Sequence, residues 1–367
     1  MPATTLTLRE INRATLARQM LLTREAIGPL AAVERLVAMQ AQLPRPPFVG
    51  LWSRVAGFTR DHLTQLLERR QVVRATLLRA TLHLVSATDY LAFRPVLQPA
   101  LDAAMHGILR TRMAGIDLAD LAARATRFLR ERPRTFQELR DEFLRADPGA
   151  DERAMGYAVR LQLPLVQVPA IEGAPWAFPS KASFAVAEDW LGCPVPAGEA
   201  PADDLVLRYL AAYGPATVAD IQAWSGLPTL GNAMARLASR LTTYRDDRKR
   251  ELFDLRGAPH PGADVPAPVR FVPDYDNLVV TRADERFVAR AHRPKVFLPG
   301  LRVAPTVLID GFVGATWRIE RTRRVATAVI EPFATLPARV RTEAQAEAEA
   351  LLRFAEPDAE TYDVRLA

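Results

Sequence analysis

Residues 217–255 have the sequence TVADIQAWSGLPTLGNAMARLASRLTTYRDDRKRELFDL, and this stretch decides the fold. Thr217 with Asp220 three residues later predicts a helix N-cap of the capping-box type, and Gly226 predicts the end of that helix. A second helix is expected from about residue 229, with one apolar face and one polar, basic face. The polar face carries Asn232, Arg236, Ser239 and Arg240. Two short strands around the charged turn at 246–250 predict a hairpin, and this order of elements is typical of a winged helix.

The same order recurs earlier in the chain. Thr135 and Glu138 predict a helix N-cap, the turn at 147–149 leads into a second helix, and strands at 165–168 and 176–178 predict the hairpin. A looser copy precedes it, with two amphipathic helices followed by strands within 72–85. The apolar positions of these helices are Leu30, Val33, Leu36 and Val37 in the first, and Leu63, Leu66 and Leu67 in the second.

The pattern changes after about residue 268. Segments at 193–201 and 257–268 are predicted linkers because they contain proline and glycine. The β-branched runs that follow are Val269–Val272, Leu278–Thr281, Val303–Ile309 and Val325–Ile330, and an Ala- and Glu-rich helix is expected around 342–354. We therefore predict an α+β fold of three tandem winged helix-turn-helix modules and a small β-rich, barrel-like C-terminal domain. The predicted boundaries are 1–115, 116–200, 201–260 and 261–367.

Charge and composition give only mild support to DNA binding. The 367 residues include 48 Lys and Arg against 42 Asp and Glu, and lysine occurs only at 181, 249 and 295. Arginine suits phosphate because its planar guanidinium donates two parallel hydrogen bonds, although a GC-rich genome also enriches arginine. The single cysteine, Cys193, excludes an intrachain disulfide, and five scattered histidines predict no metal site. The N-terminus lacks a signal-peptide pattern and no apolar run approaches about 20 residues, so we expect a cytoplasmic protein.

Two glutamines, Gln40 and Gln42, follow the helix predicted near residue 33. Continued at about 100° per residue, that helix would place the Gln40 amide on its core-facing side and Gln42 on the other side. Pro44 disfavours helical geometry at the preceding residue, so the helix is expected to end here, and unwinding could bring both amides into one cavity. The alternative is that backbone groups satisfy Gln40 and that Gln42 lies in water.

The chain resembles the AlkZ/YcaQ-type bacterial DNA glycosylases over nearly its whole length. The matching segments are AVERLVAMQAQ at 32–42, GLWSR at 50–54, TLHLV at 81–85, YGPAT at 213–217, PDYDNL at 273–278 and DGF at 310–312. The resemblance implies three tandem winged-helix modules, a barrel-like C-terminal domain and a concave DNA-binding surface. It also implies a catalytic motif of Gln, an apolar residue, then Gln or Asp, which maps onto Gln40, Ala41 and Gln42. The second Gln places the chain on the AlkZ-like side, with no cofactor.

The chemistry of alkylated purines suits a pair of amides. Alkylation at N7 of guanine or N3 of adenine makes the base cationic, so it leaves without a general acid. Two glutamine carbonyl oxygens can hold the attacking water and stabilise the developing positive charge on the sugar. No lysine lies near the motif to form a Schiff base, which favours hydrolysis without strand cleavage. A monofunctional glycosylase acting on N7-alkylguanine, N3-alkyladenine or a bulky or cross-linked adduct is therefore expected.

Several side chains are candidate DNA contacts, each with a structural alternative. His83 lies on a predicted strand and could instead be a buried structural histidine, and Arg74 and Arg79 flank it on the same hairpin. The basic helix face offers Arg236 and Arg240, which could equally be solvated or contact protein. A basic stretch containing Arg290, His292, Arg293 and Lys295 could form a hairpin along the DNA backbone. For Asp276 and Asn277 we favour a turn cap over a role near the cavity.

The rival function is that of a non-enzymatic winged-helix DNA-binding protein, such as a regulator or a lesion-binding factor, and a third possibility is a protein-interaction scaffold without DNA affinity. Regulators commonly dimerise to bind paired half-sites, and no dimerisation element is evident in the sequence. We therefore expect a monomer that acts on double-stranded DNA carrying alkylated bases and that associates with the nucleoid through DNA.

Overall fold

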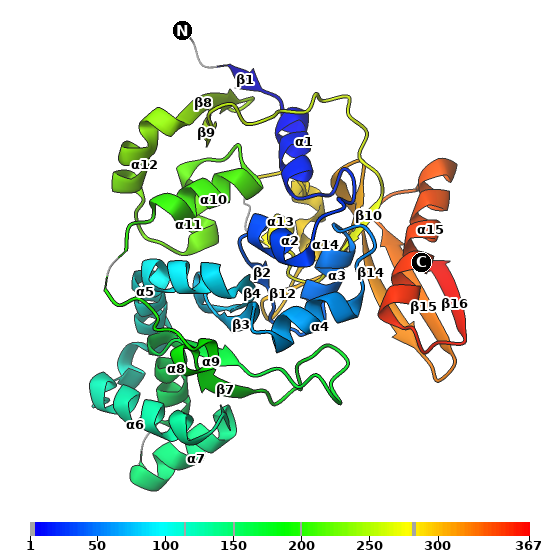
Figure 1. The fold of residues 1–367 in the computed structure, drawn as a ribbon. Helices are drawn as coiled ribbons and strands as arrows, with labels where there is room; N and C mark the ends of the chain where they lie inside the picture. The colour runs from blue at the N-terminus through cyan, green and yellow to red at the C-terminus, as the bar shows by residue number, and fades with distance from the viewer. Residues whose placement is uncertain (1–3, 114, 150, 199, 281–283) are drawn as a thin grey trace.

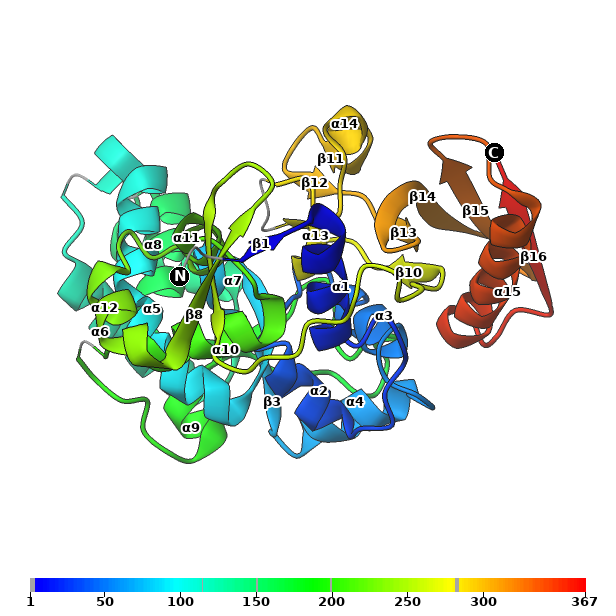
Figure 2. The same ribbon diagram turned by 90° about the horizontal axis from the view of Figure 1, so that it is seen from above.

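The computed structural model describes residues 4–113, 115–149, 151–198, 200–280 and 284–367. Helices and strands are mixed along the chain, which confirms the α+β prediction. The helices of residues 87–240 lie on one side of the molecule, and the C-terminal sheet with helix α15 (Ala338–Ala355) lies on the other (Figures 1 and 2). No helix in these described ranges is long and apolar enough to cross a membrane.

The two helices and the hairpin predicted within 217–255 are present as α11 (Val218–Ser225), α12 (Gly231–Leu237), β8 (Leu241–Asp246) and β9 (Glu251–Leu255). A further helix, α10 (Asp203–Tyr213), precedes them. Thr217 and Asp220 form the predicted capping box, and Gly226 ends α11 with a φ of +83°. The N-terminal strand β1 (Thr5–Leu6) pairs in parallel with β8, and α1 (Leu8–Arg18) packs on α10. The N-terminus thus joins the predicted third module rather than the first.

The hairpins of the first two predicted modules share one six-stranded sheet in the order β2-β4-β3-β6-β7-β5. Its strands are β2 (Met39–Gln40), β3 (Val72–Thr76), β4 (Leu82–Ser86), β5 (Arg134–Thr135), β6 (Leu165–Gln167) and β7 (Ser183–Val186). The associated helices are α2 (Pro29–Arg35), α3 (Pro46–Trp52), α4 (Arg60–Glu68), α5 (Ala87–Leu109), α6 (Leu118–Glu131), α7 (Phe136–Ala146), α8 (Glu152–Gln162) and α9 (Ala187–Leu191). Strand β3 pairs with β6 across the predicted boundary, so the two hairpins form one unit.

The predicted strand at 176–178 is wrong. The strand that forms the hairpin with β6 is β7, and residues 176–178 lie in the loop that connects the two strands. The partly buried Trp176 packs against the first predicted module, where its ring meets the Phe48 ring edge-on at 5.3 Å between centroids. Ala177 and Phe178 belong to the same core cluster. These side chains are apolar because a neighbouring core buries them, not because they alternate along a strand.

The helix expected to run to Gln40 ends at Arg35 instead. Leu36 is its C-cap, Val37 has a φ of +67°, and the chain then extends into β2. Val37 and Ala38 belong to one buried cluster, while Leu36 and Met39 belong to another. A short apolar run buried on both sides has the same composition in a helix and in a strand, so its pattern could not reveal the change.

The C-terminal sheet is open, which corrects the barrel-like prediction. Its order is β10-β13-β14-β15-β16, with β10 and β16 at the edges, and β16 pairs in parallel with β15. The strands are β10 (Arg270–Val272), β13 (Thr306–Ile309), β14 (Phe312–Arg321), β15 (Val325–Pro332) and β16 (Thr361–Leu366). Helix α15 buries Ala344, Ala348, Leu351 and Leu352 in the core of this sheet. The helix therefore covers the apolar face that closure into a barrel would otherwise bury.

Short elements connect β10 to β13. They are α13 (Asn277–Val280), η4 (Arg290–His292), α14 (Arg293–Val296), β11 (Phe297–Leu298) and β12 (Arg302–Val303). The strand expected at 278–281 is wrong for residues 278–280, which are helical, and residue 281 lies outside the described ranges. Leu278 and Val279 are buried in a core cluster, so a single buried helical turn explains their apolar character.

Candidate functional site

The Gln-Ala-Gln motif lies at the edge of the six-stranded sheet. Gln40 stands opposite His83 of β4, and the Ala41 amide N–H donates to the Leu82 carbonyl at 2.7 Å. The backbone is therefore extended through Ala41 rather than helical. The Gln40 residue is 7% exposed, whereas Gln42 is exposed. Sequence reasoning thus located the buried amide correctly but assigned it to the wrong kind of element.

The two glutamine amides are held by donors from the turn between β3 and β4 and from the first residue of β4. An Arg79 Nη2–H donates to Gln40 Oε1 at 2.7 Å, and the Leu82 backbone N–H donates to Gln42 Oε1 at 3.0 Å. Neither donor can accept a hydrogen bond, so both amides must present oxygen to them. Each carbonyl oxygen has two lone pairs and retains one for a further partner. Gln40 Oε1 is therefore bound by a side chain and not by backbone groups, and Gln42, although exposed to water, accepts a backbone hydrogen bond.

Arg79 is placed by an unusual turn. It belongs to η1 (Leu78–Ala80), where Arg79 and Ala80 have φ values of 53° and 57°. Its Nη1 donates to the Trp224 carbonyl at 2.5 Å, so the guanidinium bridges α11 and the motif. Burial lowers the pKa of Arg79 to about 10, which leaves it cationic at neutral pH. A positive φ at a non-glycine residue stores strain, and such positions concentrate at functional sites.

Arg74 supports the motif from the neighbouring strand. Its Nε donates to the Ala41 carbonyl at 2.8 Å and its Nη2 to the Gln42 carbonyl at 3.2 Å. Its guanidinium also stands over the Phe178 ring, 4.9 Å from the centroid. Burial lowers the pKa of Arg74 to about 10. The structure places this predicted DNA contact inside the protein, where it orients the Gln-Ala-Gln backbone.

His83 is completely buried. Its Nδ1 lies 3.0 Å from the Thr81 carbonyl oxygen, which requires the proton on Nδ1 and leaves a lone pair on Nε2. Within the described ranges Nε2 has no hydrogen-bond partner. Burial, together with the charge of Arg79, lowers the pKa of His83 to about 3. The ring is therefore neutral at physiological pH and does not offer a positive charge to phosphate.

A narrow cavity adjoins Gln40 where four parts of the chain converge. Its free volume is about 10 Å³, roughly the space for one water molecule. Its lining residues are Gln19, Leu36, Ala38, Met39, Gln40, Pro46, Arg54, Tyr213, Pro273, Asp276 and Asn277. The cavity therefore depends on the N-terminus, the first predicted module, helix α10 and the C-terminal region at once.

Asp276 and Asn277 contribute more than the turn favoured from the sequence. Asp276 Oδ1 does accept the Leu278 N–H at 3.0 Å, as a turn cap would. Its carboxylate also accepts two bonds of 2.9 Å from Arg54, and both side chains are at most 5% exposed. Asn277 Nδ2 donates to the Ala38 carbonyl at 2.6 Å, just before Gln40. In the sequence, a functional role for these two residues is indicated only by the segment PDYDNL at 273–278, which resembles the family.

The remaining predicted DNA contacts lie in two separate places. Arg236 forms an exposed ion pair with Asp203, and Arg240 ends η3 (Ala238–Arg240) before the β8–β9 hairpin. Arg290 and His292 lie on η4, and Arg293 and Lys295 lie on α14, so the basic stretch is two short helices and not the hairpin considered above. Lys295 lines a pocket of about 330 Å³ that Leu43 also lines. Of these residues, Lys295 is thus near the Gln-Ala-Gln loop.

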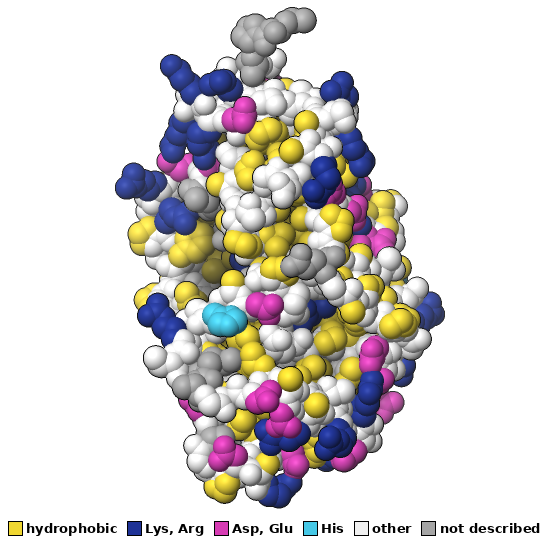
Figure 3. Space-filling model, turned by 90° about the vertical axis from the view of Figure 1, so that its left-hand side faces the viewer, with side chains coloured by type: hydrophobic (Ala, Val, Ile, Leu, Met, Phe, Trp, Pro, Cys, Tyr) yellow, Lys and Arg dark blue, Asp and Glu magenta, His cyan; other side chains and the backbone are white. Residues whose placement is uncertain are grey.

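Positive charge is unevenly distributed on the helical side of the molecule. Figure 3 shows Lys and Arg side chains gathered near the top of this face, at the height of β8 and β9. Toward the bottom, Asp and Glu side chains accompany the basic ones. On this face, the upper part therefore presents the stronger positive charge to a polyanion.

Comparison with known proteins identifies the family and the fold of the chain. Residues 33–354 match the family described as DNA glycosylase AlkZ-like. The fold is similar to that of Streptomyces sahachiroi DNA glycosylase AlkZ, with a TM-score of 0.79 and 20% sequence identity over 99% of this chain and 100% of that one. No curated protein matches the chain. The family match covers most of the chain, including the Gln40 site, and the chain belongs to the AlkZ-like DNA glycosylase family.

Proposed function

We propose that this protein hydrolyses the N-glycosidic bond of cationic alkylated purines in double-stranded DNA, with Gln40 and Gln42 as the catalytic residues. The observation that carries the proposal is the fixed orientation of both amides, by Arg79 and by the Leu82 backbone, with Gln40 lining a cavity the size of one water. Fixed dipoles stabilise a developing charge without reorganising during the reaction.

The proposed reaction needs little from the protein beyond positioning. A purine alkylated at N7 or N3 is already cationic and leaves as a neutral base, so no general acid is required. Water attacks C1′ as the bond to the base breaks, and its proton passes to solvent. The second lone pair of each glutamine oxygen accepts a hydrogen bond from this water and faces the positive charge on the sugar. An amide is too weak a base to activate water against an unmodified nucleotide, so intact DNA is spared.

We expect hydrolysis without strand cleavage, because the Gln-Ala-Gln motif itself contains no lysine. Among the described lysines, Lys295 is the one that lines the pocket shared with Leu43, and its ammonium stands over the Phe333 ring at 4.9 Å. A lyase would need a neutral amine that attacks the sugar as a nucleophile. Borohydride trapping should therefore give no covalent protein–DNA product, and Lys295→Ala should retain base release.

Excision of N7-methylguanine from duplex DNA by the purified chain tests the proposal. Gln40→Ala and Gln42→Ala should each reduce single-turnover base release about a hundredfold or more. Both variants should still bind DNA. The matched control is Gln65→Ala, an exposed glutamine of α4, which should leave the rate unchanged.

A bulky N7 adduct and a cross-linked duplex extend the same assay to larger lesions. Base release from any of these substrates that depends on Gln40 supports the proposal. Salt-sensitive DNA binding with no release from any of them would contradict it and favour the regulator considered from the sequence.

A further inference from the structure

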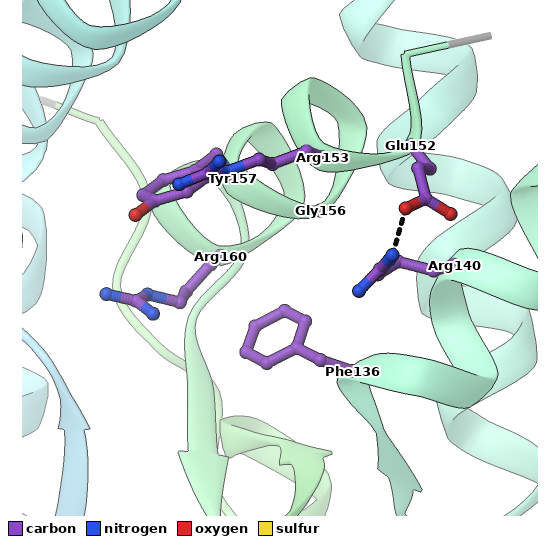
Figure 4. A pocket seen from close by; sticks show the side chains of 7 residues that line it. All are labelled: Phe136, Arg140, Glu152, Arg153, Gly156, Tyr157 and Arg160. Carbon is purple, nitrogen blue, oxygen red and sulfur yellow. Dashed lines mark hydrogen bonds and ion pairs between the residues drawn. The ribbon is translucent and has the colours of Figure 1, made fainter.

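A wide pocket lies between α7 and α8, and none of its lining residues belongs to the Gln40 site. Its volume is about 540 Å³, within the range of about 300–1,000 Å³ that is typical of small-molecule sites. Figure 4 shows guanidinium groups, aromatic rings and one carboxylate arranged around the open space. The two helices that frame it form the helix-turn-helix pair of the second predicted module.

The pocket has an excess of positive charge. Arg140 pairs with Glu152 at one end, as the dashed line in Figure 4 marks. Arg153 and Arg160 lie on the other side of the pocket, and no carboxylate pairs with either of them within the described ranges. Two uncompensated guanidinium groups in a concave site favour an anionic ligand.

Arg160 is held between aromatic rings and is partly removed from water. Its neighbours are the rings of Tyr157 and Phe136, whose centroids lie 5.6 and 6.0 Å from its guanidinium carbon. Its Nε has no hydrogen-bond partner in the described part of the chain, and burial lowers the pKa of the group. Removing a cation from water without a counter-ion is unfavourable, so a bound anion would offset a cost already present in the fold.

The two aromatic rings narrow the choice of anion. Phe136 and Tyr157 are both partly exposed to the pocket, where a planar ring could stack on them. An intact duplex presents its phosphates but keeps its bases stacked on one another. Such a backbone would use the guanidinium groups and leave the rings without a role. A nucleotide with an unstacked base would use both, because bases stack on aromatic side chains regardless of sequence.

Gly156 gives independent support. It lies inside α8, where glycine destabilises a helix relative to alanine. A Cβ built at this position would meet only Arg140 Cγ, at 4.0 Å, so neighbouring side chains do not require a glycine. Gly156 is buried and lines the pocket, so an added side chain would take up space that a closely approaching ligand could fill.

We propose that the α7–α8 pocket binds a nucleotide whose base is unstacked. The phosphate lies between Arg153 and Arg160, and the base lies against Phe136 and Tyr157. The ligand is either a free mononucleotide or the 5′-phosphorylated end of a DNA strand, which share this chemistry. The site goes beyond the proposed glycosylase function, because its occupation requires no base release.

Calorimetric titration of the full chain tests the site. The probes are deoxyadenosine 5′-monophosphate, a 5′-phosphorylated single-stranded dinucleotide, deoxyadenosine and inorganic phosphate. At least one of the first two should bind tenfold or more tightly than either deoxyadenosine or phosphate alone. Tighter binding of the mononucleotide assigns the site to free nucleotides, and tighter binding of the dinucleotide assigns it to strand ends. Equal affinity for phosphate and the mononucleotide, or no saturable binding of either phosphorylated nucleotide probe, would overturn the proposal.

Variants separate the pocket from the rest of the molecule. Arg160→Gln and Gly156→Ala should each weaken nucleotide binding tenfold or more, and the second should fold at least as well as the wild type. The control is Arg145→Gln, which removes an exposed guanidinium of α7 that pairs with Glu142 outside the pocket. Gln40→Ala should leave nucleotide affinity unchanged. If Arg160→Gln bound the nucleotide with unchanged affinity, the proposed site between α7 and α8 would be wrong.

Discussion

The bond from Arg79 to Gln40 determines which way the Gln40 amide faces. Without it, the amide could rotate and present its NH₂ group where the oxygen now lies. A donor that accepts nothing removes this ambiguity, and its second bond, to the Trp224 carbonyl, holds the donor itself. At the scale of single residues, the site is thus organised by one half-buried arginine in a strained turn.

Replacing Arg79 with methionine removes these two bonds and a longer one, of 3.4 Å, to Asn277 Oδ1, and keeps the apolar volume. We expect kcat for base release to fall about tenfold to a hundredfold with little change in KM, because the amide loses its orientation while the DNA surface remains. Arg79→Lys should recover part of kcat through one donated bond. The exposed Arg69→Met is the control. An equal change in KM and kcat, or no recovery by lysine, would contradict a positioning role.

His83 should make the fold sensitive to acid. Its pKa is lowered to about 3 in the folded protein, whereas the unfolded chain takes up this proton near the ordinary value of about 6.5. The unfolded state therefore binds more protons between these values, and stability falls as pH decreases from about 6.5 toward 3. Asparagine retains a donor for the Thr81 carbonyl, so His83→Asn should flatten the fall of Tm between pH 7.5 and 5. Parallel profiles for the two proteins would show that His83 is not responsible.

At the scale of elements, the packing of α1 against α10 leaves no space at the end of α10. Gly214 is the C-cap of α10, and a Cβ there would lie 2.6 Å from the Leu210 carbonyl oxygen. It would also lie 2.5 Å from Arg18 Nη1 and 2.7 Å from Asp254 Oδ1. Those two side chains form a buried ion pair that links α1 to β9. The glycine is required by close approach of a backbone carbonyl and a buried charge pair.

Gly214→Ala should therefore destabilise the protein by about 1–3 kcal/mol, the usual cost of overpacking. Urea unfolding followed by circular dichroism measures the change. Gly231→Ala is the control, since a Cβ at the start of α12 meets nothing within 4 Å. This control should be neutral or slightly stabilising. Equal stability of the two variants would mean that α10 can move away from Arg18 without cost.

At the scale of the whole molecule, the C-terminal region holds the segment that contains the Gln-Ala-Gln motif in place. The Arg54–Asp276 pair and the bond from Asn277 to Ala38 connect residues more than 200 positions apart. The parts that meet at Gln40 are thus connected through buried polar contacts, and the site requires all of them to be assembled. This geometry explains why neither the first predicted module nor the C-terminal region forms the cavity alone.

Breaking the Arg54–Asp276 pair on one side should be costly. Asp276→Leu leaves a buried guanidinium unpaired and should destabilise the fold by about 3–5 kcal/mol, and Arg54→Met should do the same to the carboxylate. The double variant should recover much of this loss, because no charge then remains buried without its partner. A double variant as unstable as the sum of the single variants would show that the pair is not coupled.

The sequence by itself determined the local features of this protein. The capping boxes at Thr135 and Thr217 and the β8–β9 hairpin depend on residues a few positions apart, so local composition specifies them. Tertiary structure alone decided the merged six-stranded sheet, the open C-terminal sheet and the surroundings of Gln40. Arg79 is 39 positions from Gln40, and Asn277 is 239 positions from Ala38. No periodicity encodes such pairings, because they arise only when separate apolar faces pack and bury the polar groups between them.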